Sequence, residues 1–240
     1  MEATQEMPKC WERLHKCLDN GIDRILVYGP SGTGKTFAGL HYGNIEGGSH
    51  RLICTEDMTN GDLTGNYMPG GGELHWLLGA GIKAWEGNGI IGGRLVVDEI
   101  DKAGGDVFAT LLALLDSPES ASWENPETGR IHRPRSGFSA IMTTNIEDPH
   151  DLPTALVDRF PVKIRINEPH PDAIRLLSPD LRQMARQSCD GDRRRRISLR
   201  SWMAFDGLRK GVGQDEAANI IFAERAEQIL DAIKIEVGAL

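Results

Sequence analysis

Residues 29–36 read Gly29-Pro30-Ser31-Gly32-Thr33-Gly34-Lys35-Thr36, the most informative stretch of the chain. It matches G-x-x-x-x-G-K-[ST], the pattern of a phosphate-binding loop. Glycines let the backbone turn tightly, so that several N–H groups can point at one anion. In such a loop the lysine supplies a positive charge for the β- and γ-phosphates, and the hydroxyl after it is a ligand of Mg²⁺. We therefore expect residues 29–36 to bind a nucleotide, with Lys35 at its phosphates and Thr36 at the metal.

The sequence on both sides of the loop fits the strand–loop–helix context that this motif needs. Residues 25–28 are apolar and β-prone, as in a buried strand. Residues 37–42 can continue as a helix, whose positive dipole end would face the phosphates. The alternative is a glycine-rich turn that precedes Lys-Thr by chance, and it does not account for this context.

The composition limits the classes of protein to which the chain can belong. Its 240 residues can form one large domain, or one domain with a small second one, and 40% hydrophobic residues are enough for a core. The net charge of -8 argues against a general nucleic-acid binder but leaves room for a local basic groove. No run approaches 18 apolar residues, the length that would indicate a membrane span.

Two further features favour a cytoplasmic protein. Residues 1–9 contain acidic side chains and no apolar run, so they do not resemble a signal peptide. The four cysteines, at positions 10, 17, 54 and 189, form no C-x-x-C pair, which argues against zinc ligation. Reduced thiols in the cytosol are the simplest interpretation.

A second chemical motif is the segment Leu95-Val96-Val97-Asp98-Glu99, an apolar strand that ends in two carboxylates. Ligands of α/β proteins bind at the carboxyl ends of the strands. Asp98 is therefore expected to hold Mg²⁺, mainly through water, and Glu99 to orient or deprotonate the attacking water. The alternative is a solvated acidic turn, which is less favoured downstream of a phosphate-binding loop.

The segments after this strand repeat the alternation of helix and strand. Residues 100–116 predict a helix, residues 117–137 a polar region with a hairpin turn at 127–129, and residues 138–145 a buried strand. That strand ends in Asn145, whose amide can bond the γ-phosphate or the attacking water. A short helix at 152–160, which contains Arg159, and a last strand at 162–166 follow.

A glycine-rich stretch at 62–75 is too irregular for one element and is expected to be an excursion set into a helix. The pattern of residues 76–85 predicts helix, with Trp76 and Trp85 in the core. Tyr67 and Met68 are apolar side chains at the tip of this excursion, which suggests contact with a partner. A loop that packs on itself explains them equally well.

Beyond residue 169 every predicted element is a helix, at 172–177, 179–189, 198–210 and 215–237. We therefore expect an α/β domain over 1–168 and a small helical domain over 169–240. Sequential strand–helix units with right-handed crossovers predict a three-layer α/β/α sandwich around a parallel sheet for the first domain. The arginine run at 193–196 is most simply a solvated connection, and binding to nucleic acid or to an acidic partner is the alternative.

Together these motifs resemble those of the AAA+ ATPases, specifically the MoxR-like and dynein-related (AAA_5-type) branch. The similar segments follow the family's order along nearly the whole chain: GPSGTGKT at 29–36, LVVDEIDKA at 95–103, TTN at 143–145, LVDRF at 156–160 and SLRSWMAF at 198–205. The resemblance implies a P-loop NTPase sandwich followed by a helical lid. It also implies that the stretch at 62–75 is the insert that this branch carries in its second helix.

The resemblance implies roles for individual residues. Lys35 and Thr36 match Walker A, and Asp98 and Glu99 match Walker B. Asn145 matches sensor 1.

Two arginines are carried over in the same way. Arg159 matches the arginine finger, which acts on the ATP of the neighbouring subunit. Arg200 matches sensor 2 in the lid, which reaches the γ-phosphate of its own subunit.

The predicted function is hydrolysis of ATP with Mg²⁺ in a homo-oligomeric ring, six subunits by resemblance, that remodels a partner protein or loads a cofactor. A von Willebrand-type domain protein is one candidate client, although the chain itself contains no such domain. Two alternatives remain: a DNA-associated motor or loader, which the arginine run favours, and a nucleotide-gated binding module with little turnover.

Overall fold

The computed structural model describes residues 7–190 and 195–238. The chain divides into two compact units. The sheet unit contains residues 13–29 and 35–165, and the helical unit contains residues 30–34 and 166–240 together with the segment up to residue 12. Helix α1 (Lys9–Asp19) contributes residues to both.

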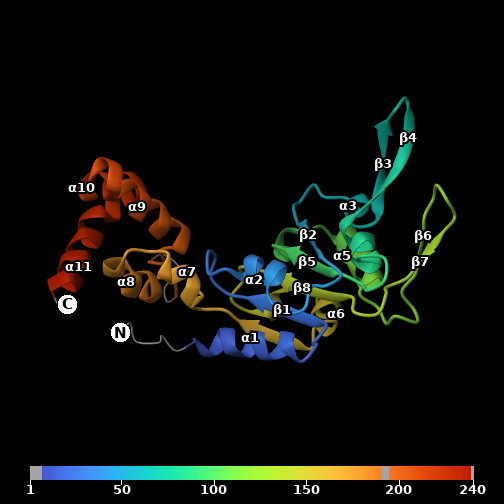
Figure 1. Cartoon of the computed structure of the whole chain (residues 1–240), viewed down its shortest axis with the longest axis horizontal. Coiled ribbons are helices and arrows are strands. Elements are labelled where there is room, and N and C mark those ends of the chain that lie inside the picture. Colours follow the sequence, from blue (N-terminus) through green and yellow to red (C-terminus); the bar gives the residue numbers. More distant parts are fainter. Residues whose placement is uncertain (1–6, 191–194, 239–240) are drawn as a thin grey trace. The chain divides into compact units, whose positions relative to one another are not determined.

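The sheet unit is built on five parallel strands in the order β2-β5-β8-β1-β9 (Figure 1). The strands are β1 (Arg24–Tyr28), β2 (Ser49–Ile53), β5 (Arg94–Asp98), β8 (Ser139–Thr143) and β9 (Val162–Arg165). The apolar side chains of the three central strands, β5, β8 and β1, are buried on both faces of the sheet, as expected of parallel strands between helices. Because all five run the same way, their carboxyl ends meet at one edge of the sheet.

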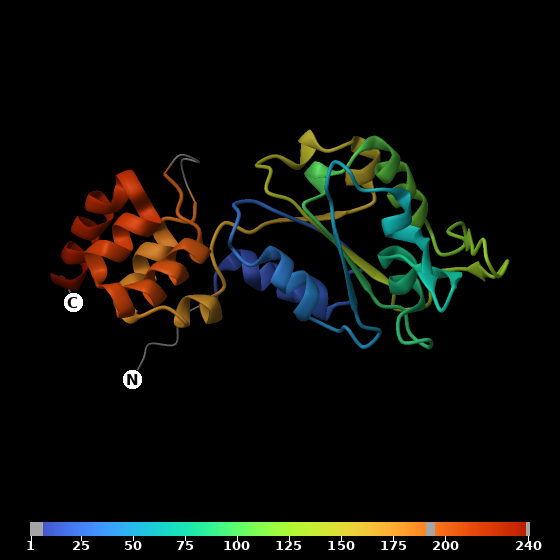
Figure 2. The same ribbon diagram turned by 90° about the horizontal axis from the view of Figure 1, so that it is seen from above.

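Helices cover both faces of this sheet (Figures 1 and 2). On one face, Leu95 and Val97 share a core with Trp85 and Leu111 from two helices. On the other face, Gly39 lies so close to the sheet that a Cβ there would be 3.1 Å from a methyl carbon of Val96. The α-helices of this unit beyond α1 are α2 (Lys35–His41), α3 (Asn60–Thr64), α4 (Ala80–Glu86), α5 (Gly105–Leu114) and α6 (Thr154–Asp158). The predicted three-layer sandwich with a parallel sheet is confirmed.

The glycine-rich stretch forms a β-hairpin, which corrects two predictions. Strands β3 (Gly65–Gly70) and β4 (Glu73–Leu78) pair antiparallel, and Gly71 and Gly72 make the turn with positive φ. Tyr67 lies opposite Trp76 in the ladder rather than at the tip of a loop. The helix predicted over 76–85 is wrong for 76–78, because those residues continue β4 and α4 begins at Ala80.

The helix predicted over 100–116 is also interrupted. Residues Ile100–Lys102 form one 3₁₀ turn, η1, and the backbone is extended at Ala103 before α5 begins at Gly105. Two consecutive glycines, the poorest helix formers after proline, explain the break. The hairpin predicted near 127–129 is present as β6 (Trp123–Glu124) paired with β7 (Ile131–His132). A second 3₁₀ turn, η2 (Pro149–Asp151), precedes α6.

All regular elements described in the helical unit are helices, as predicted (Figure 2). They are α7 (Pro171–Arg175), η3 (Pro179–Leu181), α8 (Arg182–Gln187), α9 (Leu199–Val212), α10 (Gln214–Phe222), η4 (Ala223–Arg225) and α11 (Ala226–Gly238). The core contains Trp202, Phe205 and Ile229. At its rim Arg209 donates to the carboxylates of Asp180 and Asp206, which ties α9 to η3. In the described part of the chain, no helix is long and apolar enough to cross a bilayer.

Candidate nucleotide-binding site

Three neighbouring strands bring the predicted site residues to the same edge of the sheet. Strand β1 leads into Gly29, β5 ends at Asp98, and β8 leads through Thr143 and Thr144 to Asn145. Strand β8 lies between β5 and β1, so its end separates the carboxylate from the loop. This is where a doubly wound sheet binds its ligands.

Glycine shapes the phosphate-binding loop. Gly29, Gly32 and Gly34 all have positive φ, a conformation that other residues rarely adopt. The Thr33 hydroxyl donates to the carbonyl of Pro30 at 3.1 Å and closes the turn. A Cβ on Gly32 would come within 2.9 Å of the Ser198 Cβ, at the start of α9. The loop backbone thus has the tight turns that anion binding requires.

The Lys35 side chain connects the segments that follow strands β1 and β8. It is the first residue of α2 and is only 6% exposed. Its Nζ donates to the carbonyl of Gly29 at 2.9 Å and to Oδ1 of Asn145 at 3.0 Å. A buried ammonium must be paired, so these contacts keep the Lys35 charge at the mouth of the loop. The predicted phosphate-binding lysine and the predicted sensor amide are therefore direct neighbours.

Asp98 is the centre of a second set of contacts. Its Oδ1 accepts hydrogen bonds from the hydroxyls of Thr36, at 2.7 Å, and Thr143. Its Oδ2 is bound by the guanidinium of Arg51, from β2. Burial alone would raise the pKa of Asp98, but the hydrogen bonds from Thr143, Arg51 and Thr36 outweigh it and lower the pKa. Asp98 is therefore ionised at neutral pH.

The residues fit a magnesium ion. Mg²⁺ takes hard oxygen ligands and is held by one or two side chains together with water and substrate phosphates. The Thr36 hydroxyl and the Asp98 carboxylate are 2.7 Å apart and both supply such oxygens. Among the described residues no group of three or more histidine, cysteine or acidic side chains could form a closed cage for a metal ion. An open two-residue site next to the phosphate loop matches the preference of magnesium.

Glu99 has an unusual backbone. Its φ and ψ are 56° and 46°, in the left-handed region that a glutamate seldom occupies. Its carboxylate forms an ion pair with Lys102 at 2.5 Å, and its side chain is about one-third exposed. A strained residue directly after the metal-binding candidate is typical of functional sites. Water can reach this carboxylate.

Of the two predicted arginines, Arg159 lies in the sheet unit and Arg200 in the helical unit. Arg159 is at the carboxyl end of α6, and its Nη2 lies 3.5 Å from Oδ1 of Asp116. Both side chains are roughly 40% exposed. Arg200 is the second residue of α9 in the helical unit, is exposed, and follows the Ser198 that packs against Gly32. Arg159 therefore pairs with an acid of its own chain.

Sequence reasoning missed Arg51, Thr143 and Lys102, which contact the site carboxylates. Arg51 lies in the middle of the short strand β2, and its partner depends on which strand β2 pairs with. Thr143 precedes the recognised Asn145 by two residues. Lys102 follows Glu99 by three residues, a spacing that places side chains on one side of a helical turn.

A protein-family model matches residues 24–160 of this chain, and its description is AAA domain, dynein-related subfamily. The chain belongs to this family. The match covers β1 to α6 and so includes the phosphate-binding loop, Asp98, Asn145 and Arg159. No curated protein matches the sequence.

Two solved structures are similar to this chain, and the first of them shares its fold. NtrX from Brucella abortus, determined in complex with ATP, is 15% identical with a TM-score of 0.56, over 85% of this chain and 51% of that one. A candidate ATPase from Cytophaga hutchinsonii is 21% identical with a TM-score of 0.47, over 68% of this chain and 46% of that one. The chain thus spans about half the length of each.

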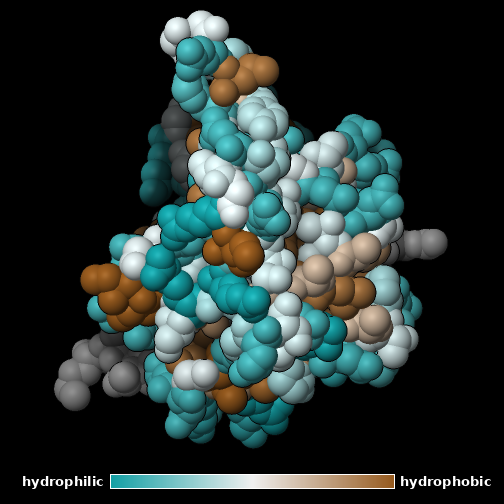
Figure 3. Space-filling view, turned by 90° about the vertical axis from the view of Figure 1, so that its right-hand side faces the viewer, coloured by the Kyte–Doolittle hydropathy of each residue, from teal (hydrophilic) through white to brown (hydrophobic). Residues whose placement is uncertain are grey.

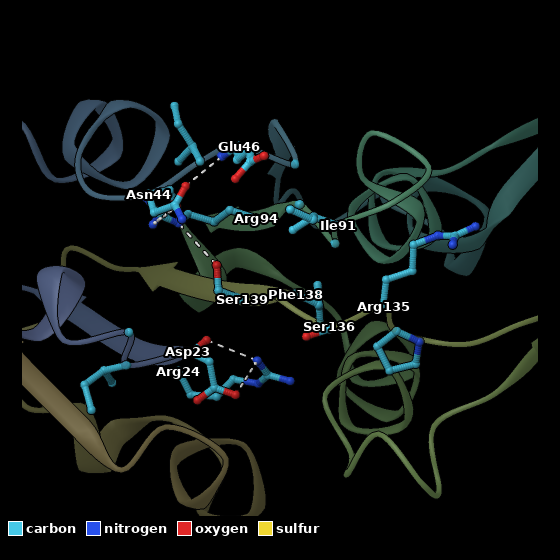
Figure 4. A pocket seen from close by; sticks show the side chains of 18 of the residues that line it. Asp23, Arg24, Asn44, Glu46, Ile91, Arg94, Arg135, Ser136, Phe138 and Ser139 are labelled. Atoms are coloured by element: carbon cyan, nitrogen blue, oxygen red, sulfur yellow. Dashed lines mark hydrogen bonds and ion pairs between the residues drawn. The ribbon is translucent and has the colours of Figure 1, made fainter.

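The AAA domain also has a cavity at the opposite edge of the sheet, of about 480 Å³ (Figure 4). Arg24, Arg94 and Ser139, which line it, are the first residues of β1, β5 and β8. The buried Arg94 guanidinium donates to the carbonyls of Gly39, Tyr42 and Asn44, so it ties loops together. Burial lowers the pKa of Arg94 to about 10. This cavity is remote from Lys35 and Asp98 along the strands.

Proposed function

We propose that this AAA domain binds ATP with Mg²⁺ and hydrolyses the bond between its β- and γ-phosphates. One observation carries the proposal: Lys35 bonds Asn145 while Thr36 bonds Asp98. Four side chains, two from the start of α2 and one from the end of each of two strands, therefore lie together where the loop would hold phosphates. A nucleotide-gated module with little turnover would need only the loop, whereas this site also includes the carboxylates and the amide.

Each residue has a defined task in this proposal. The backbone N–H groups of residues 31–34 and the Lys35 ammonium bind the β- and γ-phosphates. Thr36 and Asp98 would hold Mg²⁺, which supplies charge stabilisation to the phosphate oxygens when bound. Asn145 orients the γ-phosphate or the water, and Glu99 accepts the proton of that water as it attacks phosphorus and ADP departs.

The two arginines complete the proposed machinery. Arg159 acts on the nucleotide of a neighbouring subunit, for which it must exchange Asp116 for phosphate oxygens. Arg200 acts on the γ-phosphate of its own subunit. Both arginines would stabilise charge that develops during phosphoryl transfer.

We further propose that the active form is a cytoplasmic ring, with six subunits, in which residues 1–168 are the α/β domain and 169–240 the lid. The ring would act as a MoxR-like remodelling or cofactor-loading chaperone on a client protein, a von Willebrand-type domain protein being one candidate. The alternative of a DNA-associated motor gains no support. Of the arginine run, residues 193 and 194 lie outside the described residues, and Arg196 lies 3.9 Å from Asp190.

Titration with a fluorescent ATP analogue tests the proposal. Lys35→Ala removes the cation at the loop and should weaken the affinity by about tenfold or more, because charge-assisted bonds to phosphate are lost. Lys163→Ala, at an exposed position on β9, is the matched control and should bind like the parent. Equal affinities of the parent and Lys35→Ala proteins would refute nucleotide binding by this loop.

A further inference from the structure

Strand β2 has a free edge. It is the outermost strand of the sheet, and within the described residues it pairs only with β5. The backbone N–H of Arg94 donates to the carbonyl of Gly48, and the backbone N–H of Cys54 donates to the carbonyl of Asp98. The main-chain groups of the even-numbered residues from 48 to 54 therefore point toward β5. Main-chain groups alternate between the two sides of a strand. Those of Ser49, Arg51 and Ile53 therefore point away from β5, toward the open edge of the sheet. Such an edge is a template for another strand.

A groove of about 410 Å³ lies along this edge. Ser49 and Arg51 of β2 form one side, Lys83 of α4 contributes a positive charge, and Met68 and Leu77 of the β3–β4 hairpin contribute apolar surface. Met68 and Leu77 are each about half exposed. Figure 3 shows one small hydrophobic patch near the end of the projecting part, among hydrophilic and neutral residues. The groove thus combines unpaired main-chain groups with apolar contacts.

The lining of the groove carries two positive charges, on Arg51 and Lys83, and one negative charge, on Asp62, which accepts from the N–H and hydroxyl of Thr59 at the start of α3. Arg51 is already paired with Asp98, so Lys83 supplies the positive charge that is available to a ligand. His50 adds no charge at neutral pH, because burial and the nearby Lys83 lower its pKa. The complementary ligand is therefore acidic.

We propose that this groove binds an extended acidic segment of a client protein, which adds to the free edge of β2 as a further strand. This inference rests on the proposed action on a partner protein and names the surface that receives it. Main-chain groups of Ser49, Arg51 and Ile53 pair with the segment, as in other cases of strand addition. Alternate side chains of the segment reach Lys83 and the apolar pair Met68 and Leu77.

The groove is joined to the nucleotide site through one side chain. Arg51 lines the groove and also binds Oδ2 of Asp98. A carboxylate of the bound segment would compete with Asp98 for this guanidinium. Occupation of the groove would thereby change the charge around Oδ2 of Asp98, whose carboxylate is the proposed magnesium ligand.

Binding is tested with a fluorescein-labelled peptide of four alternating valine–glutamate pairs, without nucleotide. Fluorescence anisotropy should show saturable binding that Lys83→Glu weakens tenfold or more. The matched control, Lys163→Glu, makes the same charge change on β9, the opposite edge strand, and should bind within twofold of the parent. A peptide with proline in place of the central valines should lose binding, because proline cannot donate to a ladder.

Hydrogen exchange distinguishes strand addition from simple charge attraction. The peptide should slow exchange of amides in 49–53 and leave 162–165 unchanged. Absence of binding, equal loss in both lysine variants, or no protection at 49–53 would overturn the proposal. If the amides of 49–53 become more protected as the protein concentration rises, without peptide, the edge would be assigned to a second copy of this chain instead. Lys35→Ala protein should bind the peptide normally, so failure here is separable from failure of the nucleotide assignment.

Discussion

The Asp98 carboxylate receives hydrogen bonds from three elements: Thr36 of α2, Thr143 of β8 and Arg51 of β2. Each of its two oxygens has a fixed role, because the hydroxyls share Oδ1 and the guanidinium takes Oδ2. This arrangement keeps the charge ionised and directed toward Thr36. At the residue scale, the site is held in place by bonds between side chains of neighbouring strands.

Glu99→Gln separates nucleotide binding from chemistry. The amide has the shape of the carboxylate and is compatible with the same left-handed backbone, but it cannot accept a proton from water. We expect normal affinity for the ATP analogue, a stabilised oligomer and a loss of turnover of about 10²-fold or more. Phosphate-release assays and size-exclusion chromatography measure these effects. Hydrolysis at the parent rate would exclude Glu99 as the group that acts on water.

At the scale of elements, the two hairpins differ in how they are held. The β6–β7 hairpin is tied to α4, because Glu86 is bonded by Arg130, His132 and Arg135. The β3–β4 hairpin makes fewer such contacts, although Trp76 stacks near Trp123 with ring centroids 5.8 Å apart. The β6–β7 hairpin is thus fixed to α4 by charge, and the β3–β4 hairpin packs on it through the rings of Trp76 and Trp123.

The Glu86 contacts make the stability of the fold depend on pH. Burial alone would raise the pKa of Glu86, yet bonds from Arg135 and His132 lower it below the ordinary 4.5. The ionised carboxylate therefore stabilises the fold above that pH, and the contribution disappears as pH falls through the lower, folded-state value. Glu86→Gln should cost about 1–3 kcal/mol at pH 7, and the difference from the parent should shrink below pH 4.5. Urea unfolding at pH 7 and pH 3.5 measures it, with the exposed Glu119→Gln as control.

Tyr67 and Met68 lie on opposite faces of β3 and should respond differently to replacement. Tyr67 packs edge-on against Trp76 with ring centroids 5.0 Å apart, so Tyr67→Ser should destabilise the hairpin by about 0.5–1.5 kcal/mol. Met68 lines the groove beside β2, so Met68→Ser should leave stability and basal ATPase unchanged but lower stimulation by a client. Thermal unfolding and ATPase assays with the valine–glutamate peptide separate the two. Equal destabilisation by both variants would give Met68 a structural role.

At the scale of the whole molecule, much of the fold was predictable because the chemical motifs require particular strands and helices around them. A phosphate-binding loop needs a strand before it and a helix after it, and parallel strands must bring their carboxyl ends together. Thr36, Asp98 and Asn145 could therefore be placed at one edge from sequence alone. The same rule could not give the contact between Arg51 and Asp98, since it depends on β2 lying next to β5.

Other features were missed for local reasons. Glycines at 65 and 70–72 obscured the alternation of the β3–β4 hairpin, and the pair at 104 and 105 interrupted an otherwise apolar helical pattern. The ion pair of Arg159 with Asp116 joins α6 to the segment after α5, and no sequence spacing indicates it. Side-chain pairing across elements is set by tertiary packing, which a single sequence does not display.

A mixing experiment tests whether Arg159 acts between subunits. Its contact with Asp116 is exposed and therefore weak, so the guanidinium can leave it at little cost. Arg159→Ala should bind ATP but lose about 10³-fold in turnover. Mixing it with Lys35→Ala should recover part of the activity, because one interface then has an intact loop and an intact arginine. Mixed rings without recovery at any ratio would contradict action in trans.

The pairing of β1 has a consequence for synthesis on the ribosome. This strand leads into the phosphate loop, yet its neighbours in the sheet are the late segments 139–143 and 162–165. A nascent chain that has not reached these segments exposes an apolar strand with both edges open. Such non-local pairing slows folding and prolongs exposure to aggregation. We expect chains truncated before residue 139 to bind chaperones, and arrested chains to resist proteolysis only after β9 has left the exit tunnel.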